Sequence, residues 1–241
     1  MGAERQRAEE FAGRLAEAYG DALVSVTLYG SAARGEYREG SSDLNLLVLL
    51  RGAEARTLRR GARVAREWAA AGERPPLVLP EAEWLDSADV FPIEYSDMRD
   101  AHVVLHGSDP FDGIRIEWRD LRLQCEHEIK AKQIRLRERY LLSADQPEEL
   151  GALLLASAST FLTLFRSGLR LAGAEVPRDG GEVVSAIAER AGFDPAGFRE
   201  VLRARSADGD FAPAGDGPVV MGYLDAVERT AGWLDQLHPT E

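Results

Sequence analysis

Apolar residues recur along the first part of the chain with two different spacings. Between residues 4 and 19 they fall on one side of a helix, and in two later runs they follow one another closely, as in buried strands. The second run, 44–50, is nearly continuous, which is typical of a strand covered on both faces. The elements predicted here are a helix over 4–19, a strand over 22–29, a helical turn over 32–37, a strand over 44–50, a helix over 54–71, and strands over 77–79, 91–95 and 102–105.

The second half of the chain is predicted to be helical throughout. A segment dense in turn residues, 107–113, precedes it and marks a domain boundary. Residues 153–171 are apolar almost all round, which predicts the core helix of a bundle. We therefore predict an α/β (α+β) chain, with a small mixed-sheet domain at 1–112 and an all-helical bundle domain at 113–241. The predicted helices are 116–142, 147–172, 180–191, 195–206 and 218–237.

Composition and charge limit what the protein could bind. A formal net charge of −12 argues against a protein that binds bulk nucleic acid through its overall field, although a local basic cleft is compatible with it. The single cysteine, Cys125, excludes an intramolecular disulfide and any multi-cysteine zinc site, and it fits a reducing cytoplasm. The start of the chain has no signal-like apolar core, and no apolar run approaches the ~20 residues that span a bilayer. We expect a cytoplasmic protein with no membrane partner.

One stretch, residues 28–45, combines a phosphate site with a metal site. A predicted strand ends at a Gly-Ser pair where a helical turn begins, so Gly30 lets a phosphate approach the backbone and Ser31 offers a hydroxyl and an amide. The neighbouring strand begins with Ser-Asp-Leu-Asn at 42–45. Asp43 is then placed to hold Mg²⁺ against the same phosphates, and the residue two further on faces the same side of the strand.

This order resembles the signature of the DNA polymerase β-type nucleotidyltransferases: Gly-Ser, a spacer of about ten residues, then two acidic positions separated by one residue. The resemblance covers roughly residues 8–106, and Phe-Pro-Ile-Glu-Tyr-Ser at 91–96 resembles a strand of the aminoglycoside adenylyltransferases. The helical remainder is similar, more loosely, to the C-terminal bundles of kanamycin and streptomycin nucleotidyltransferases. The resemblance implies triphosphate binding by Gly30, Ser31, Arg34 and Ser42, metal binding by Asp43, Asn45 and Glu94, and catalysis by Asp43 and Glu94.

Asn45 departs from the pattern, because the family normally has its second carboxylate there. Mg²⁺ prefers carboxylate oxygen, and an amide donates an oxygen without a charge. Three interpretations follow: an active transferase with weakened or one-metal chemistry, a nucleotide-binding module without catalysis, or a pocket turned to another ligand. Because the rest of the motif is intact, we favour nucleotide binding.

The long helix predicted near 117–142 carries polar residues along its apolar stripe. In the antibiotic-modifying proteins that the chain resembles, a lysine of the helical domain contacts the nucleotide. Lys132, with Arg135 in support, is therefore the candidate for the β- and γ-phosphates, and Gln124 and Glu128 are candidates for the acceptor. The alternative is an intrahelical Glu128–Lys132 pair that stabilises the helix by a few tenths of a kcal/mol.

The same helix suggests a remote alternative. Arg122 and His127 match the loose Arg-x4-His pattern of HEPN ribonucleases, although the two side chains project from different sides of an ideal helix. The first hypothesis remains transfer of a nucleoside monophosphate from an NTP, with ATP favoured, to a hydroxyl of a small molecule or macromolecule, with Mg²⁺ or Mn²⁺. A small-molecule acceptor is favoured. The second is a catalytically impaired nucleotide-binding or regulatory module that senses nucleotide or pairs with a partner protein.

Overall fold

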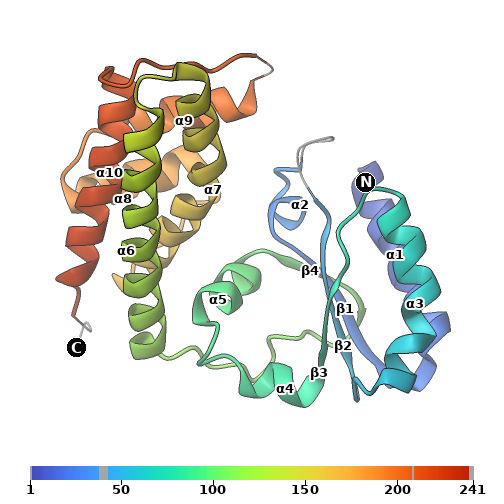
Figure 1. The fold of residues 1–241 in the computed structure, drawn as a ribbon. Helices are drawn as coiled ribbons and strands as arrows, with labels where there is room; N and C mark the ends of the chain where they lie inside the picture. The colour runs from blue at the N-terminus through green and yellow to red at the C-terminus, as the bar shows by residue number, and fades with distance from the viewer. Residues whose placement is uncertain (1, 38–42, 208, 239–241) are drawn as a thin grey trace. The chain divides into compact units, whose positions relative to one another are not determined.

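The computed structural model describes residues 2–37, 43–207 and 209–238, and the chain forms two compact units, Met1–Ile116 and Glu117–Glu241. The first unit contains α1 (Ala3–Tyr19), the short 3-10 helix η1 (Gly20–Ala22), β1 (Leu23–Tyr29), α2 (Ser31–Arg34), β2 (Asn45–Leu50), α3 (Ala55–Ala70), β3 (Leu77–Pro80), α4 (Glu81–Asp86), α5 (Pro92–Asp100) and β4 (His102–Gly107). The second contains α6 (Trp118–Ser143), α7 (Pro147–Leu171), α8 (Gly180–Ala191), α9 (Ala196–Ser206) and α10 (Pro218–Asp235) (Figure 1).

The four strands form one mixed sheet in the order β3-β2-β1-β4. β1 pairs antiparallel with both β2 and β4, whereas β2 and β3 run parallel. Tyr29, the last residue of β1, lies opposite Asn45 on one side and His102 on the other. The turn at 30–31 and the segment 43–45 therefore meet at the same end of the sheet, and these residues together are called the strand-end site below.

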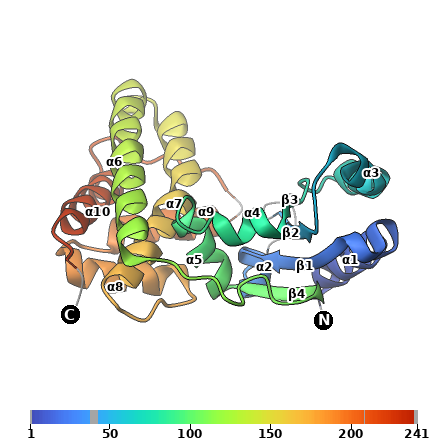
Figure 2. The ribbon, with the colours of Figure 1, turned by 90° about the horizontal axis from the view of Figure 1, so that it is seen from below.

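Helices α1 and α3 cover one face of the sheet (Figures 1 and 2). Phe11 of α1 and Trp68 of α3 pack ring to ring, with centroids 4.3 Å apart, over buried side chains of β1 and β2. Close approach of the two helices depends on Gly61, because a Cβ there would overlap the ring of Tyr19. Apolar side chains fill this face of the sheet. A polar functional site can therefore lie only on the opposite face or at the strand ends.

Helices α4 and α5 lie on the opposite face, where Leu47 of β2 joins a second core cluster. Trp84 stacks on Tyr95 with ring centroids 3.9 Å apart, and the Tyr95 hydroxyl donates to the Trp84 carbonyl at 2.6 Å. The Trp84 indole N–H donates to the carbonyl of Pro110 at 2.7 Å. These contacts fix α4, α5 and the following segment to the sheet.

The strand predicted over 91–95 is wrong, because these residues begin helix α5. Pro92 occupies the first helical position, where its fixed φ suits a helix and its missing N–H costs no hydrogen bond. The buried positions of α5 include three pairs with the helical spacing of three residues, 92–95, 93–96 and 95–98, although 93 and 95 alone also fit an alternating strand. The run was too short for its period to be read correctly from sequence.

The predicted domain boundary also needs a small correction. Residues 113–116 were assigned to the helical domain, yet Ile114 and Ile116 pack against the core cluster of the first unit. Both are apolar residues in an extended segment, so they lengthen the hydrophobic face of α4 and α5 before α6 begins. Contacts divide the chain after Ile116.

The second unit is a bundle in which α6 packs along α7, and α10 packs against both α6 and α9 (Figure 2). Phe198 and Tyr223 stack at its centre with centroids 4.6 Å apart. By length and composition α7 is the one helix in the described part of the chain that could cross a membrane, although the sequence offered no such run. Within the unit 56% of its most apolar window is buried, as in a core helix.

Candidate active site

The strand-end site starts at Gly30, which has φ 79° and ψ −146°, a conformation that residues with a side chain rarely adopt. Its amide donates to the carbonyl of Ala101 at 3.2 Å, so the turn is anchored next to β4. A Cβ on Gly30 would lie 3.2 Å from the Nδ2 atom of Asn45. The backbone angle therefore requires glycine here, and a Cβ would in addition crowd the Asn45 amide.

Ser31 opens α2, a single helical turn that ends at Gly35 in the left-handed conformation. Arg34, at the end of that turn, was predicted to contact phosphate. Its Nη2 atom lies 2.8 Å from Oδ2 of Asp97 on α5, and its side chain is only 10% exposed. Arg34 therefore ties α2 to α5, and in this state its charge is committed to Asp97 rather than open to a ligand.

Asp43 and Asn45 flank the start of β2, two residues apart as the sequence predicted. The Asp43 carboxylate forms an ion pair with Arg74, with Oδ2 and Nε 2.8 Å apart. Both groups are solvent-accessible, with 40% of the Asp43 side chain and 71% of the Arg74 side chain exposed. Ser42, the remaining predicted residue of this motif, lies outside the described residues.

Glu94 lies in the first turn of α5 and not on a strand. It is exposed, and it precedes Asp97 by three residues, so the two carboxylates share one side of the helix. Because Asp97 binds Arg34, this side of α5 faces the turn at Gly30 and Ser31. The predicted third acidic residue is thus carried by a different element from the one predicted, on the side of α5 that faces α2.

A divalent cation does not fit the described donor set as it stands. At the start of β2 the Asp43 carboxylate is paired with Arg74, the Glu73 carboxylate accepts from the Leu44 amide and is paired with Arg7, and Asn45 offers only an amide. Among the described residues no three His, Cys, Asp or Glu side chains converge in a way that could hold a metal ion. Glu94 lies on α5 and belongs to no such group among the described residues.

Comparison with known proteins agrees with this geometry. Residues 8–84, which span β1, the Gly30 turn and β2, match the model of the nucleotidyltransferase domain family. The first unit carries a nucleotidyltransferase domain. The whole chain also has the fold of the spectinomycin adenyltransferase AAD(9) from Enterococcus faecialis, a structure solved with ATP and spectinomycin. The TM-score is 0.58 and the sequence identity 13%, over 96% of this chain and 99% of that chain. No curated protein matched by sequence.

Two residues near the strand-end site are not among those that the sequence predicts. Arg74 and Asp97 each bind a predicted site residue, at positions far along the sequence. Tyr29 adds a third polar group: burial raises the pKa of its phenol, and the positive charge of Arg74 offsets part of that rise. Only the strand register would have found Arg74, because in the parallel β2–β3 pair Leu47 lies opposite Leu77 and residue 74 falls beside residue 44.

The predicted polar residues of the second unit lie on α6, whose apolar stripe is buried against α7 as expected. Lys132 forms the intrahelical pair, with its Nζ atom 3.6 Å from Oε2 of Glu128. Arg135 is exposed and Gln124 is half-buried. These four side chains share one side of α6, away from the ion pair that Lys130 makes with Asp235 of α10.

The Arg122 and His127 pattern is not assembled into a site. The Arg122 guanidinium binds the carboxylate of Glu126 and donates to the carbonyl of Asp235 at 3.1 Å. His127 points to solvent with 76% of its side chain exposed. Nothing in this geometry favours the ribonuclease alternative.

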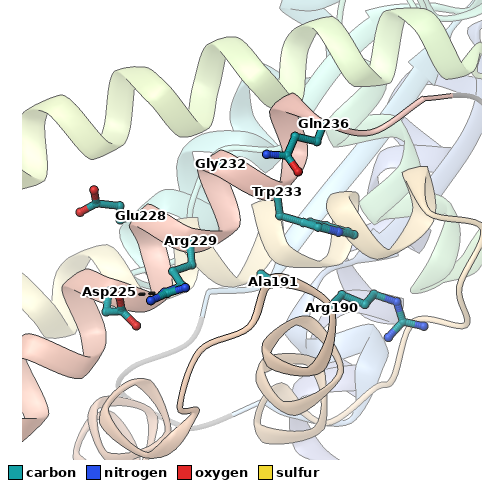
Figure 3. A pocket seen from close by; sticks show the side chains of 8 residues that line it. All are labelled: Arg190, Ala191, Asp225, Glu228, Arg229, Gly232, Trp233 and Gln236. Carbon is teal, nitrogen blue, oxygen red and sulfur yellow. Dashed lines mark hydrogen bonds and ion pairs between the residues drawn. The ribbon is translucent and has the colours of Figure 1, made fainter.

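A groove of about 400 Å³ lies in the second unit between the end of α8 and α10 (Figure 3). Asp225 at one end pairs with Arg229 at 3.1 Å, and Glu228 pairs with Arg137 of α6 at 3.3 Å. Arg190 and Trp233 lie at the other end. The groove is open and its acidic groups are already paired, so we assign no ligand to it.

Proposed function

We propose that the nucleotidyltransferase domain binds a nucleoside triphosphate, ATP in the first instance, at the strand-end site. It then transfers the nucleoside monophosphate to a hydroxyl of a small molecule. The observation that carries the proposal is the meeting of the Gly30–Ser31 turn with Asp43 at one end of the sheet. The fold shared with an adenyltransferase solved with ATP and a small molecule supports the choice of ATP and of a small acceptor.

In this proposal the triphosphate lies against the backbone at Gly30, where no side chain blocks it, and accepts hydrogen bonds from the amide and hydroxyl of Ser31. The acceptor oxygen attacks the α-phosphorus in line. As that bond forms, the bond from the α-phosphorus to the bridging oxygen breaks, and pyrophosphate leaves. Glu94 takes the acceptor proton as general base, a role that suits an exposed carboxylate on the side of α5 facing the turn.

The second unit contributes to the same proposal through α6. Lys132 and Arg135 would bind the β- and γ-phosphates, since both are cations on one side of the helix. Gln124 and Glu128 would bind the acceptor. Mg²⁺ enters the proposal as a companion of the triphosphate, and no step is assigned to it because the described donors do not form a site by themselves.

The test is a transfer assay with ATP, GTP, CTP and UTP, with Mg²⁺ present, against a panel of small hydroxyl compounds. Pyrophosphate release that needs an acceptor supports the proposal. Glu94→Gln should lower the rate by about 100-fold, the lower end of what a general base contributes. Glu83→Gln, a matched change on exposed α4, should leave the rate unchanged. No pyrophosphate release with any acceptor would reject transfer.

Two observations favour a second candidate, a nucleotide-binding module without transfer. Asn45 brings no charge to the position beside Asp43, and Asp43 itself is paired with Arg74. In that case the protein binds ATP but releases no pyrophosphate, and Asn45→Asp creates or strongly raises the transfer reaction. If transfer is already present and Asn45→Asp lowers it, asparagine belongs to a working site and the second candidate is rejected.

A further inference from the structure

Asn45 is the only asparagine in the chain, and its side-chain amide lies against the Gly30 turn. A Cβ added to Gly30 would lie 3.2 Å from Nδ2 of Asn45, and among the described residues it would meet no other atom within 4 Å beyond its chain neighbours. The N–H₂ group of Asn45 therefore faces the same space beside Gly30 in which the proposed function places the phosphates. The side chain is half-buried and forms no hydrogen bond with another described residue, so its two donors are open to a ligand.

The neighbours of Asn45 across the sheet carry no carboxylate. Tyr29 lies directly opposite Asn45 in the strand register and shares its face of the sheet. Burial raises the pKa of the Tyr29 phenol, so this group is neutral at physiological pH. His102 lies on the far side of Tyr29, and its ring nitrogens lie 2.9 Å from the Arg99 carbonyl and 3.2 Å from the Asp109 carboxylate. Within this row, it is Asn45 whose donors face the turn.

Three carboxylates around this end of the sheet are each neutralised by an arginine. The pairs are Asp43 with Arg74 at 2.8 Å, Glu73 with Arg7 at 3.4 Å, and Asp97 with Arg34 at 2.8 Å. A further carboxylate at position 45 would repel a phosphate in contact with it and, when ionised, could donate no hydrogen bond. An amide has the same shape without the charge, and it supplies N–H donors to phosphate oxygens. Position 45 thus has the chemistry of an anion-binding group.

We propose that Asn45 is a phosphate-binding residue: its amide N–H donates a hydrogen bond to a phosphate oxygen of the nucleotide beside Gly30. The inference rests on the proposed nucleotide site and adds a donor to those of Ser31 at the same turn. It gives the departure from the family pattern a positive role, because asparagine replaces repulsion of the phosphates by a contact with them. The contact needs no other ligand, so it is measurable in the presence of a chelator.

The first experiment measures ATP binding to the full chain in the presence of a chelator. Asn45→Ala removes the donor and should weaken binding about tenfold, the lower end for a hydrogen bond to a charged group. Asn45→Asp keeps the shape and adds a charge, so it should weaken binding about fivefold further, since like charges about 4 Å apart repel even at the dielectric constant of water. Ala55→Asp is the matched control: it adds the same charge at the exposed start of α3, which follows the other end of β2, and should bind ATP like the natural protein.

The second experiment uses inorganic tripolyphosphate as a competitor of ATP, again with a chelator. Asn45→Ala should weaken tripolyphosphate binding by the same factor of about ten, because the contact is with phosphate and not with the base or the ribose. ATP affinity that is unchanged in both Asn45 variants would overturn the proposal and leave the proposed nucleotide site in place. Weaker ATP binding with unchanged tripolyphosphate binding would also overturn it. No ATP binding by the natural protein, with chelator or with Mg²⁺, would reject the proposed function itself and this inference with it.

Discussion

The strand-end site of the first unit and the polar side of α6 in the second unit show two ways of presenting polar groups. At the strand ends, residues from β1, β2, α2, α5 and the loop before β3 come together, although they are scattered from position 29 to position 97. On α6 the polar residues are neighbours in sequence, and Lys132 simply pairs with Glu128 one turn away. A sheet brings together residues that are far apart in sequence, whereas one side of a helix carries residues that are close in sequence.

Because of that difference, the two regions give unequal support for a ligand-binding site. The strand-end site has a backbone conformation that requires glycine, a fixed register and ion pairs to other elements. On the polar side of α6 no glycine conformation and no strand register fixes the side chains, and the ion pair between Glu128 and Lys132 lies within the helix. A charged stripe of this kind is equally compatible with simple solvation. Our proposal therefore places nucleotide binding at the strand-end site first and gives α6 a supporting part.

The largest effects should come from cutting into each core separately. Trp84→Ala removes the stacked side chain over the sheet of the first unit, and Phe198→Ala removes the stacked ring at the centre of the bundle. Each should lower the free energy of unfolding by about 3–5 kcal/mol. Hydrogen exchange should show lost protection in the unit that carries the change. Equal loss in both units for both variants would mean that the two cores do not behave as separate units.

Next in size is the backbone of the strand-end site. Gly30→Ala places a Cβ at φ 79° and ψ −146°, a region essentially limited to glycine, at a cost of about 1–3 kcal/mol, and Gly35→Ala places one in the left-handed helical region at a cost of about 1–2 kcal/mol. Only at position 30 does the new Cβ meet the Asn45 amide, since nothing lies within 4 Å of it at position 35. Gly30→Ala should lose at least as much stability as Gly35→Ala in thermal unfolding, while ATP affinity should fall in Gly30→Ala alone. If both variants lose ATP affinity equally, the loss comes from backbone strain and not from a Cβ that blocks the phosphate at position 30.

The sequence predicted most of this fold because its long elements carry strong periods. The helices of the second unit and strands β1, β2, β3 and β4 lie where the sequence predicts them. Most of their ends differ from the predicted ends by no more than two residues. Short elements were less readable: α5 was taken for a strand, and α4 was not predicted. A short run of apolar residues fits both the helical and the strand period. Packing against Leu47 and Trp84 then determines that the segment forms a helix.

The candidate site was only partly predictable for a related reason. Gly30, Ser31, Asp43 and Asn45 lie within one continuous motif, so their order was enough to group them. Arg74 and Asp97 are single charged residues with no local pattern, and only the strand register and the packing of α5 bring them to the site. The binding roles of Lys132, Arg135, Gln124 and Glu128 remain predictions.

A smaller effect tests whether α6 does more than display charge. Lys132→Ala should weaken ATP binding by about tenfold if its ammonium binds phosphate, because a charge-assisted hydrogen bond is worth about 1.5 kcal/mol or more. Its cost in stability should be only a few tenths of a kcal/mol, the value of an i,i+4 pair. Lys130→Ala is the matched control on the same helix, since Lys130 pairs with Glu126 and Asp235. Equal ATP affinity in both variants would leave α6 a solvated helix.

The smallest expected effect is on the pH dependence of stability, and it comes from Cys125 in the second unit. Burial raises the pKa of its thiol to about 12, and its side chain is fully covered. The folded state keeps the thiol neutral, so this contribution to stability is complete below the ordinary pKa of about 8.5 and is lost as pH rises from there toward 12. A plot of stability against pH should be flatter for Cys125→Ala above pH ~8.5.

The same thiol separates the two units chemically. At pH ~8, a thiol reagent should modify Cys125 faster in Phe198→Ala than in the natural protein, because the reaction needs the bundle to open. Trp84→Ala should leave the rate as it is. Faster modification in Trp84→Ala would show that opening of the first unit exposes the bundle core.

The most direct test of the central claim is calorimetric titration with ATP, with Mg²⁺ and with a chelator, for the natural protein and for Asp43→Asn. If the strand-end site binds the nucleotide, Mg²⁺ should tighten ATP binding to the natural protein, and Asp43→Asn should remove that gain. Absence of ATP binding under both conditions, or unchanged Mg²⁺ dependence in Asp43→Asn, would contradict the assignment of this site.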